Sequence, residues 1–417
     1  MSPKSRTFFI LFFFFLIVLI GLIVYCFLHP ELLNLKGKYQ NKIGQNFSNK
    51  AIKEEKSILS NSISTITQNE TTTLPSSDLF GSYYSKAEEL LKTMSLEDQV
   101  GQMFFVRCPE SNQIDMIQNL KPAGFILFGR DFKNKTKEQV MDDISSYQKA
   151  SNIPLLMGTD EEGGSVVRVS SNRNLCLENF NSPSYLYQIG GFEKIISDTK
   201  EKSKLLLSLG INVNLAPVAD VSTNPNDFIY KRTFQKDALQ TSEYVEKVVK
   251  TMLEEGISCT LKHFPGYGNN IDTHTDVAHD HRSYDTFTSS DFKPFEAGIQ
   301  AGATSILVSH NIVSCMDETH PASLSPKVHE ILRNDLGFTG VIITDDLAMD
   351  AITKYTKGTN AAVEAVKAGN DLIITTDFAS QKQAILDAVQ NDEISKDDIY
   401  THVLRVLAWK YSMGILE

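Results

Sequence analysis

Short apolar runs recur along the chain from about residue 100 onward, and amphipathic stretches separate them. The runs are rich in β-branched and aromatic residues and carry few charges, which is typical of strands buried on both faces. The stretches between them repeat apolar positions at helical spacing. The predicted strands are Met103–Val106, Gly124–Phe128, Leu155–Gly158, Val213–Pro217, Cys259–Lys262, Ser305–Ser309, Val341–Thr344 and Asp371–Thr375.

Helices are predicted between these strands, and their alternation with the strands indicates an α/β fold. Eight strand–helix units between residues 83 and 417 most simply close into a (β/α)8 TIM-type barrel. The alternative is an open doubly wound sheet. No GxGxxG follows the first strand and no P-loop lysine motif is present, so a nucleotide-binding fold lacks support. The predicted helices include Ser85–Gln102, Lys137–Ala150, Ser242–Glu255, Pro326–Asp335 and Asn360–Ala368.

The N-terminal segment Phe8–Leu28 has 21 residues without a charge, which is long enough for a transmembrane helix. Lys4 and Arg6 precede it, and no small-residue cleavage site follows it. We therefore expect an uncleaved membrane anchor over residues 1–29. A cleaved signal and lipidation at Cys26 are the alternatives.

Residues 30–82 are dominated by Asn, Ser, Thr, Lys and Gln, and we expect a disordered polar linker there. Residues 83–417 then form the catalytic barrel. A short N-terminal tail favours a single-pass protein of the cell membrane with its catalytic domain outside the cytoplasm. Shaving intact cells with protease tests this placement, since a protected barrel would contradict it.

Composition narrows the function classes. The net charge of −11 argues against nucleic acid as the main partner. Five cysteines lie far apart without a CxxC pair, so the framework of a small disulfide-rich domain is absent. Four of them, Cys108, Cys176, Cys259 and Cys315, lie outside the apolar segment and could form disulfides. Because Cys259 and Cys315 fall in or beside predicted strands, we favour buried free thiols.

Polar and ionisable residues follow nearly every predicted strand. In a barrel of this kind the active site is built at the carboxyl ends of the strands, so these side chains should meet at one rim. A single carboxylate there often only caps a helix, but the recurrence indicates a functional site. The main candidates, in chain order, are Asp160, Arg168, Asp220, Arg232, Lys262, His263, Asp272, His274, His310, Asp345 and Asp346.

The residue types point to one kind of chemistry. No Ser-His-Asp arrangement with a GxSxG elbow is present. The histidines at 263, 274, 279 and 281 with interleaved aspartates could suggest a metal, but they lack the HExxH spacing, and we predict neither a metal nor a cofactor. A carboxylate nucleophile with a histidine that transfers protons, and cations that hold hydroxyls, suits glycosyl transfer.

Several long motifs are similar to those of glycoside hydrolase family 3, in its single-domain β-N-acetylglucosaminidase (β-N-acetylhexosaminidase) branch. The resemblance runs from about Met94 to the end of the chain. It implies a (β/α)8 barrel and a terminal β-linked N-acetylglucosamine substrate from cell-wall muropeptides. The motifs are DEEGGSVVR, NVNLAPVADV, KRTF, KHFPGYG, DTH, PASLSPKV and GFTGVIITDDLAMDA.

The resemblance implies roles for individual residues. Asp345 matches the catalytic nucleophile, and Asp346 is a neighbour with a structural role. His274 matches the acid/base, oriented by Asp272; an aspartate bonded to one imidazole nitrogen fixes the tautomer and suits proton transfer near neutral pH. A direct role for His310 stays open. The residues that match the grip on the sugar hydroxyls are Asp160, Arg168, Arg232, Lys262 and His263.

Two departures from the family pattern fall on the loop that carries the acid/base. Tyr267 stands where the family usually has a second histidine, and the stretch from Lys262 to His274 is one residue shorter than expected. The alternative functions are a β-glucosidase or other exo-glycosidase, a phosphorylase, and an inactive glycan-binding barrel. The expected partners are a carbohydrate substrate and the membrane through the N-terminal helix, without nucleic acid, and a monomer is expected.

Overall fold

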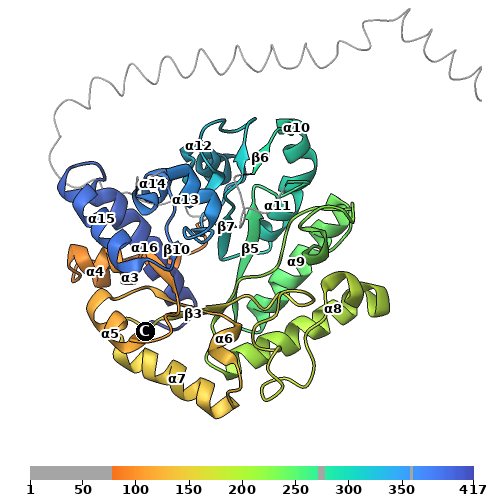
Figure 1. Ribbon diagram of the computed structural model, residues 1–417, viewed down its shortest axis with the longest axis horizontal. Coiled ribbons are helices and arrows are strands. Elements are labelled where there is room, and N and C mark those ends of the chain that lie inside the picture. Colours follow the sequence, from red (N-terminus) through yellow and green to blue (C-terminus); the bar gives the residue numbers. More distant parts are fainter. Residues whose placement is uncertain (1–77, 271–277, 357–359) are drawn as a thin grey trace, which may run out of the picture. The chain divides into compact units, whose positions relative to one another are not determined.

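Eight parallel strands form the centre of the protein in the computed structural model, which describes residues 78–270, 278–356 and 360–417 (Figure 1). Their order in the sheet is β10-β1-β2-β3-β4-β5-β7-β9. The strands are β1 Phe104–Arg107, β2 Gly124–Leu127, β3 Leu156–Thr159, β4 Val213–Asn214, β5 Ser258–Phe264, β7 Ser305–Val308, β9 Val341–Thr344 and β10 Ile373–Thr375.

The sheet is nearly closed into a barrel. Neighbouring strands pair in parallel, and a parallel bridge between Ile343 of β9 and Leu372, just before β10, joins the two ends of the order. An open doubly wound sheet would leave these two strands as separate edges. The arrangement is therefore consistent with the predicted TIM-type barrel, and each predicted strand is found within three residues of its expected bounds.

Helices surround the strands, as the alternating pattern predicts (Figure 1). Apolar strand residues are buried on both faces, because one face fills the barrel and the other packs against helices. The helices are α3 Tyr84–Leu91, α4 Leu96–Gly101, α5 Gln113–Leu120, α6 Gly129–Phe132, α7 Lys137–Ala150, α8 Pro183–Ser208, α9 Ala238–Glu254, α10 Tyr284–Thr286, α11 Phe292–Gln300, α12 Pro326–Glu330, α13 Asp350–Thr356, α14 Ala361–Ala368, α15 Phe378–Gln390 and α16 Lys396–Ser412.

The predicted helix Ser85–Gln102 is wrong as one element, since α3 and α4 are separate helices. Ser95 lies between them in an extended conformation, and its side chain accepts a hydrogen bond from the backbone N–H of Asp98. This is a helix N-cap, so a new helix starts where the apolar spacing suggested continuity. A second sheet of two short strands, β6 His279–Asp280 and β8 Ile312–Val313, has no counterpart in the predicted pattern.

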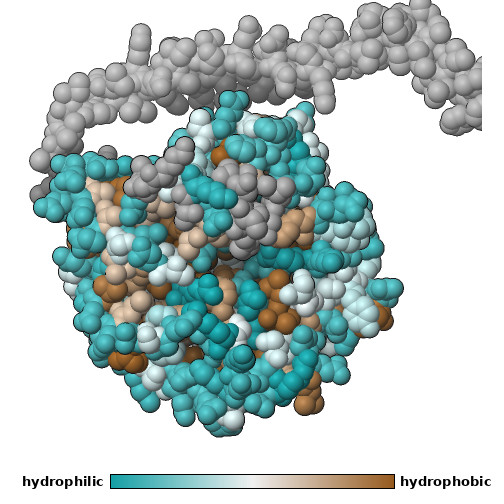
Figure 2. Space-filling view, in the orientation of Figure 1, coloured by the Kyte–Doolittle hydropathy of each residue, from teal (hydrophilic) through white to brown (hydrophobic). Residues whose placement is uncertain are grey.

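Apolar side chains are largely directed to the interior. Hydrophilic residues dominate the face shown in Figure 2, with apolar residues scattered between them. Cys108, Cys176, Cys259 and Cys315 are all free thiols, as predicted, but Cys315 is exposed rather than buried. Among the described residues, no helix combines the length and apolar character needed to cross a membrane. The predicted anchor Phe8–Leu28 and most of the linker lie outside the described residues.

The amino ends of the strands contain a buried lysine. Lys410 of α16 is fully buried and donates to Oε1 of Gln102 at 2.8 Å; Gln102 in turn donates to the carbonyl of Pro122, just before β2. Burial lowers the pKa of Lys410 to about 7. Between pH 7 and 10 the unfolded chain therefore binds one proton more than the folded protein, and the contribution of Lys410 to stability rises with pH by about 1.4 kcal/mol per unit.

We expect Lys410→Met to raise the free energy of unfolding at pH 7 by about 1–3 kcal/mol, because methionine carries no charge to desolvate while Gln102 loses one donor. The gain over the wild type should shrink as pH rises from 7 to 10. Urea unfolding across this range measures both effects. The control is Lys396→Met, an exposed lysine of the same helix, which should show no such trend. A pH-independent gain for Lys410→Met would contradict the assignment.

Candidate active site

A cavity of about 280 Å³ opens at the carboxyl ends of the strands. Four cations and four carboxylates lie in its wall, together with apolar side chains from several strands. A polar, enclosed site at this end of a parallel barrel is the usual place of an active site. The structure brings six of the predicted site residues together here, namely Asp160, Arg168, Arg232, Lys262, His263 and Asp345.

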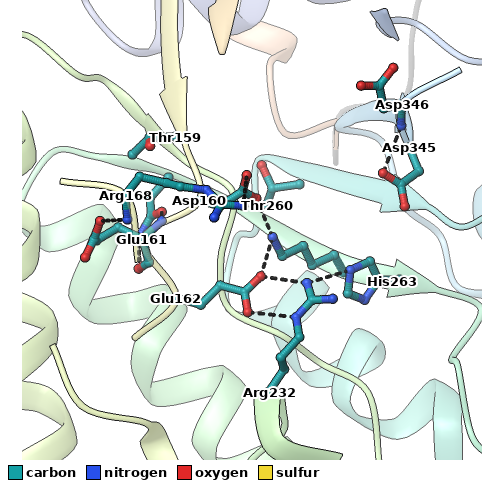
Figure 3. Close-up of polar contacts among 12 residues, drawn as sticks. Thr159, Asp160, Glu161, Glu162, Arg168, Arg232, Thr260, His263, Asp345 and Asp346 are labelled. Atoms are coloured by element: carbon teal, nitrogen blue, oxygen red, sulfur yellow. Dashed lines mark hydrogen bonds and ion pairs between the residues drawn. The ribbon is translucent and has the colours of Figure 1, made fainter. Parts of the chain in front are cut away.

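Three consecutive carboxylates follow β3, and they point in different directions. Asp160 and Glu162 line the cavity, and both accept from Nζ of Lys262 at 2.7 Å (Figure 3). Glu161 instead accepts from the backbone N–H groups of Arg168 and Val169, each at 2.7 Å, and shapes the loop. Asp160 is therefore paired with Lys262, and Glu162, to which the sequence assigned no role, is a further residue of the site.

Glu162 is the centre of the charge network. Arg232 binds it with two parallel hydrogen bonds, Nε to Oε2 at 3.0 Å and Nη2 to Oε1 at 2.7 Å. Burial opposes ionisation of Glu162, but the charges of Arg232 and Lys262 outweigh it and hold its pKa well below the ordinary value. Burial disfavours the charge on Lys262 too, and Asp160 and Glu162 overcome this and raise its pKa. Glu162, Arg232 and Lys262 are thus all held in their charged forms.

His263 has both ring nitrogens engaged. Nε2 lies 3.0 Å from Nη2 of Arg232, and because a guanidinium can only donate, Nε2 is the acceptor. The ring proton therefore lies on Nδ1, which donates to Asp220 Oδ2 at 2.7 Å. His263 can orient Arg232 in this state, but it is not placed to transfer a proton to a substrate. Asp220 is a second residue that was not assigned a role from the sequence.

Asp220 also holds the chain that follows β5. It is 1% exposed and accepts from the backbone N–H groups of His263 at 3.0 Å and Tyr267 at 2.7 Å. The ring of Tyr267 is buried and stands edge-on to His263, with 5.2 Å between ring centroids. The tyrosine at the position of the family's second histidine is thus accommodated as a packing residue beside the site.

Asp345 and Asp346 follow β9 and line the same cavity. The N–H of Asp345 donates to the carbonyl of Val308 at 3.0 Å, which fixes its backbone against β7. Its Oδ1 accepts from the N–H of Asp346 at 2.8 Å (Figure 3). Asp346 Oδ1 accepts from the N–H of Ala348, so this carboxylate also supports the turn. Burial raises the pKa of Asp346, and the charge of Asp345 adds to the effect.

His310 supports the same turn from outside the cavity. Its Nε2 lies 3.0 Å from the carbonyl oxygen of Asp346, and its Nδ1 lies 2.7 Å from Oγ of Ser323. A carbonyl can only accept, so Nε2 donates to it and Nδ1 accepts from the serine hydroxyl. His310 is not among the residues that line the cavity. Its contacts assign it to positioning the turn after β9.

Arg107, at the end of β1, is a further cation of the cavity. Its guanidinium lies over the ring of Phe128, 4.3 Å from the centroid, and Arg168 approaches the same ring at 5.4 Å. Its buried Nε has no hydrogen-bond partner among the described residues. The sequence pattern ended the first strand at Val106, which left this residue without a place at the rim.

Asp272 and His274, the predicted acid/base pair, lie outside the described residues. The described residues still narrow the search for a proton donor. Asp160 and Glu162 are held by cations, and His263 is engaged at both nitrogens. Asp346 accepts from the N–H of Ala348 and supports the turn after β9.

A nearly closed parallel barrel with carboxylates and cations at its carboxyl rim is an arrangement that suits a glycoside hydrolase. The comparisons place the chain within that class. The family described as glycosyl hydrolase family 3 N terminal domain matches residues 95–409, and the chain belongs to this family.

Curated relatives share the sequence of the barrel. A protein of Stenotrophomonas maltophilia (strain R551-3) named beta-hexosaminidase is 33% identical over 272 residues, which cover 62% of this chain and 78% of that protein. A beta-hexosaminidase of Xylella fastidiosa (strain M23) is 32% identical over 272 residues, covering 63% and 77%.

Solved structures are also similar to this chain. The glycoside hydrolase family 3 beta-N-acetylglucosaminidase from Paenibacillus sp. str. FPU-7 superposes with a TM-score of 0.71 at 28% identity, covering 77% of this chain. This chain spans 63% of that protein, which is less than two thirds. A beta-N-acetylhexosaminidase from Beutenbergia cavernae DSM 12333 has a TM-score of 0.68 at 26% identity, covering 77% of this chain and 99% of that one. A beta-glucoside phosphorylase with a TM-score of 0.71 at 20% identity shares the fold.

Proposed function

We propose that the protein is a retaining exo-β-N-acetylglucosaminidase that removes terminal non-reducing N-acetylglucosamine from glycans. The observation that carries this proposal is the position of Asp345 in the same cavity as the network of Asp160, Glu162, Arg232 and Lys262. The volume of about 280 Å³ lies just below the usual range of ligand pockets. This favours one sugar residue over an extended chain, and hence exo action.

The charge network suits recognition of the glycone. Ionised carboxylates accept from sugar hydroxyls, and Lys262 and Arg168 can donate to them, so the cavity offers charged acceptors and charged donors to a sugar. Because these charged side chains already pair with one another, they stay ionised without rearrangement when a sugar displaces water from the cavity. Part of this binding can be used to hold the distorted ring of an oxocarbenium-like transition state.

The chemistry then takes two steps. The carboxylate of Asp345 attacks the anomeric carbon as the bond to the leaving oxygen breaks, and an acid protonates that oxygen. Water then attacks the glycosyl ester, the same group removes its proton, and Asp345 is released with the anomeric configuration retained. We assign the acid/base role to His274 with Asp272, because both nitrogens of His263 are engaged.

The beta-hexosaminidase relatives support N-acetylglucosamine as the sugar, and the expected anchor Phe8–Leu28 favours peptidoglycan-derived fragments as the source. The phosphorylase and β-glucosidase alternatives share the same first step. A phosphorylase differs only in the acceptor of the second step, because phosphate replaces water and the product is a sugar phosphate.

The test uses the full chain with aryl β-N-acetylglucosaminide, aryl β-glucoside and a disaccharide of N-acetylglucosamine linked to N-acetylmuramic acid. We expect turnover of the first and third substrates, a β-configured sugar as the first product in proton NMR, and no acceleration by phosphate. Faster turnover of the glucoside would favour a β-glucosidase. Release of sugar 1-phosphate would favour a phosphorylase, and an α-configured first product would exclude the double-displacement mechanism.

A further inference from the structure

Arg282 joins three segments next to the site. It follows β6, where the chain returns to the barrel after the loop that leaves β5. Its guanidinium donates to Asp280 on its own segment, with Nη2 to Oδ2 at 2.7 Å, and through Nη1 to Oδ1 of Asp291 at 2.8 Å. Nη2 also donates to the carbonyl of Gly266 at 3.0 Å. One side chain thus fastens the outgoing stem (residues 265–270) to the returning stem (residues 278–282) and to the helical segment before α11.

The pair of Arg282 with Asp291 is buried. Asp291 is 2% exposed, and the guanidinium of Arg282 lies over the ring of Phe287, 4.3 Å from its centroid. Burial raises the pKa of Asp291 to about 6 against the lowering effect of Arg282; Asp220 and Asp280 raise it further. A buried carboxylate of this kind depends on its partner, because removing the guanidinium would leave an uncompensated charge.

The outgoing stem is shaped to lie against this pair. Gly266 has φ +124°, and a Cβ there would come within 2.5 Å of Oδ1 of Asp291. Gly268 has φ +55°, and its Cβ would lie 2.3 Å from Cζ of Arg282. Neither position accepts a larger residue unless Asp291 or Arg282 is displaced. The two glycines of the KHFPGYG motif therefore allow the close approach of the stem to Arg282.

A second link ties the same two stems together. Nδ2 of Asn270, at the end of the outgoing stem, donates to the carbonyl of Tyr267 at 2.8 Å and to Oδ2 of Asp280 at 2.7 Å. Asp220 holds the other side of the outgoing stem through Tyr267 and also binds His263 of the cavity. The stems are thus connected by direct hydrogen bonds to the wall of the active site.

We propose that Arg282 is a positioning residue that holds residues 265–270 and 278–282, the two stems of the loop after β5, beside the glycone cavity, acting through Gly266, Asp280 and Asp291. This rests on the proposed function, since the sequence places the acid/base pair on that loop. A misaligned loop would still permit binding and attack by Asp345 when the leaving group is good. It would fail when the leaving oxygen needs a proton.

The structure offers a matched control at the opposite end of the barrel. Arg333 is, like Arg282, a partly buried arginine, and it donates to an aspartate, Asp371, at 2.6 Å and to the backbone carbonyls of Phe338 and Gly340. It too lies over a phenylalanine ring, that of Phe338. Arg282→Lys and Arg333→Lys therefore remove contacts of the same kind, although Asp371 also keeps Arg405 and His402 as partners, and only Arg282 lies beside the site.

The experiment compares kcat/KM of the full-length variants over a series of β-N-acetylglucosaminides whose leaving groups range from dinitrophenol to a sugar. For Arg282→Lys we expect less than about a threefold loss with dinitrophenol and about a hundredfold loss with the disaccharide, as for loss of a general acid. Asp291→Asn keeps the shape of the side chain and removes its charge. Its kcat/KM should likewise fall more with the disaccharide than with the dinitrophenyl substrate. The dependence of kcat/KM on the leaving group in His274→Ala is the reference for loss of the acid.

Arg333→Lys should lower the melting temperature but leave the leaving-group dependence unchanged. Equal losses of Arg282→Lys across the series, or the same slope in Arg333→Lys, would overturn the positioning role while leaving the proposed function intact. A wild-type protein without turnover of any N-acetylglucosaminide would overturn the proposed function, and the role of Arg282 with it.

Discussion

Asp345→Ala should lower kcat on aryl β-N-acetylglucosaminide by about three to five orders of magnitude, which is typical of removing a nucleophile. The physical reason is that no other group of the described cavity can form the glycosyl ester from that direction except the neighbouring Asp346, whose side chain supports the turn through Ala348. The fold should survive, because the backbone N–H of Asp345 that bonds to Val308 is kept.

Azide distinguishes loss of the nucleophile from general damage. With an activated aryl substrate, azide should occupy the space left by the Asp345 carboxylate and attack the anomeric carbon from the same face. The expected product is the α-glycosyl azide, identified by NMR, with a recovery of turnover that saturates with azide concentration. Asp346→Asn is the control; its amide oxygen can still accept from Ala348, and we expect a loss of no more than about tenfold. An active Asp345→Ala enzyme or a β-azide would falsify the assignment.

Lys262→Met should damage both stability and activity. Lys262 is 2% exposed and its ammonium is shared by Asp160 and Glu162. Its removal leaves two carboxylates facing each other with Arg232 and Arg168 as the remaining cations. Breaking a buried pair in this way costs about 3–5 kcal/mol of unfolding free energy. If a similar amount of transition-state binding is lost, kcat/KM falls by roughly two to four orders of magnitude.

The pH dependence gives an independent check of the same variant. In the wild type the pKa of Glu162 is held low, so its contribution to stability is complete above the ordinary carboxylate value and is lost only as pH falls toward the lowered pKa. Without Lys262 the pKa of Glu162 should rise, and its protonation would relieve the repulsion between the two carboxylates. The stability difference between wild type and variant should therefore shrink as pH falls from 7 to 5.

Lys382→Met is the control for this comparison. Lys382 is also a buried lysine, 6% exposed, but it donates to the carbonyl of Leu120 at the amino end of β2. It should lose some stability and keep kcat/KM. Denaturant unfolding at several pH values gives the unfolding free energies of the wild type and both variants, and steady-state kinetics give their kcat/KM. A Lys262→Met protein with normal kcat/KM would refute a role of this network in holding the sugar.

Local patterns in the sequence were sufficient for the architecture. The eight strands, several of the helices between them and the carboxylates that follow β3 and β9 could be predicted, because strand and helix periodicities depend on neighbouring residues. The position of Asp345 at the end of a strand followed from the same pattern, and the family motifs assigned its role. The split between α3 and α4 was missed because one serine side chain, that of Ser95, starts the second helix.

The tertiary structure alone decided which polar residues meet. Lys262 and Asp160 are 102 residues apart, and Arg232 and Glu162 are 70 apart, so no local spacing relates them. Parallel pairing in the sheet places the ends of β3, β4 and β5 side by side, and the fold selects Glu162 rather than Glu161 for the cavity. Likewise, Asp220 with His263, Arg107 over Phe128, and Arg282 with Asp291 are contacts between different strand ends or loops. The sequence by itself determined the elements and the chemistry available at each strand end; the pairing of charges required the tertiary structure, because a buried charge is stable only beside the partner that the fold supplies.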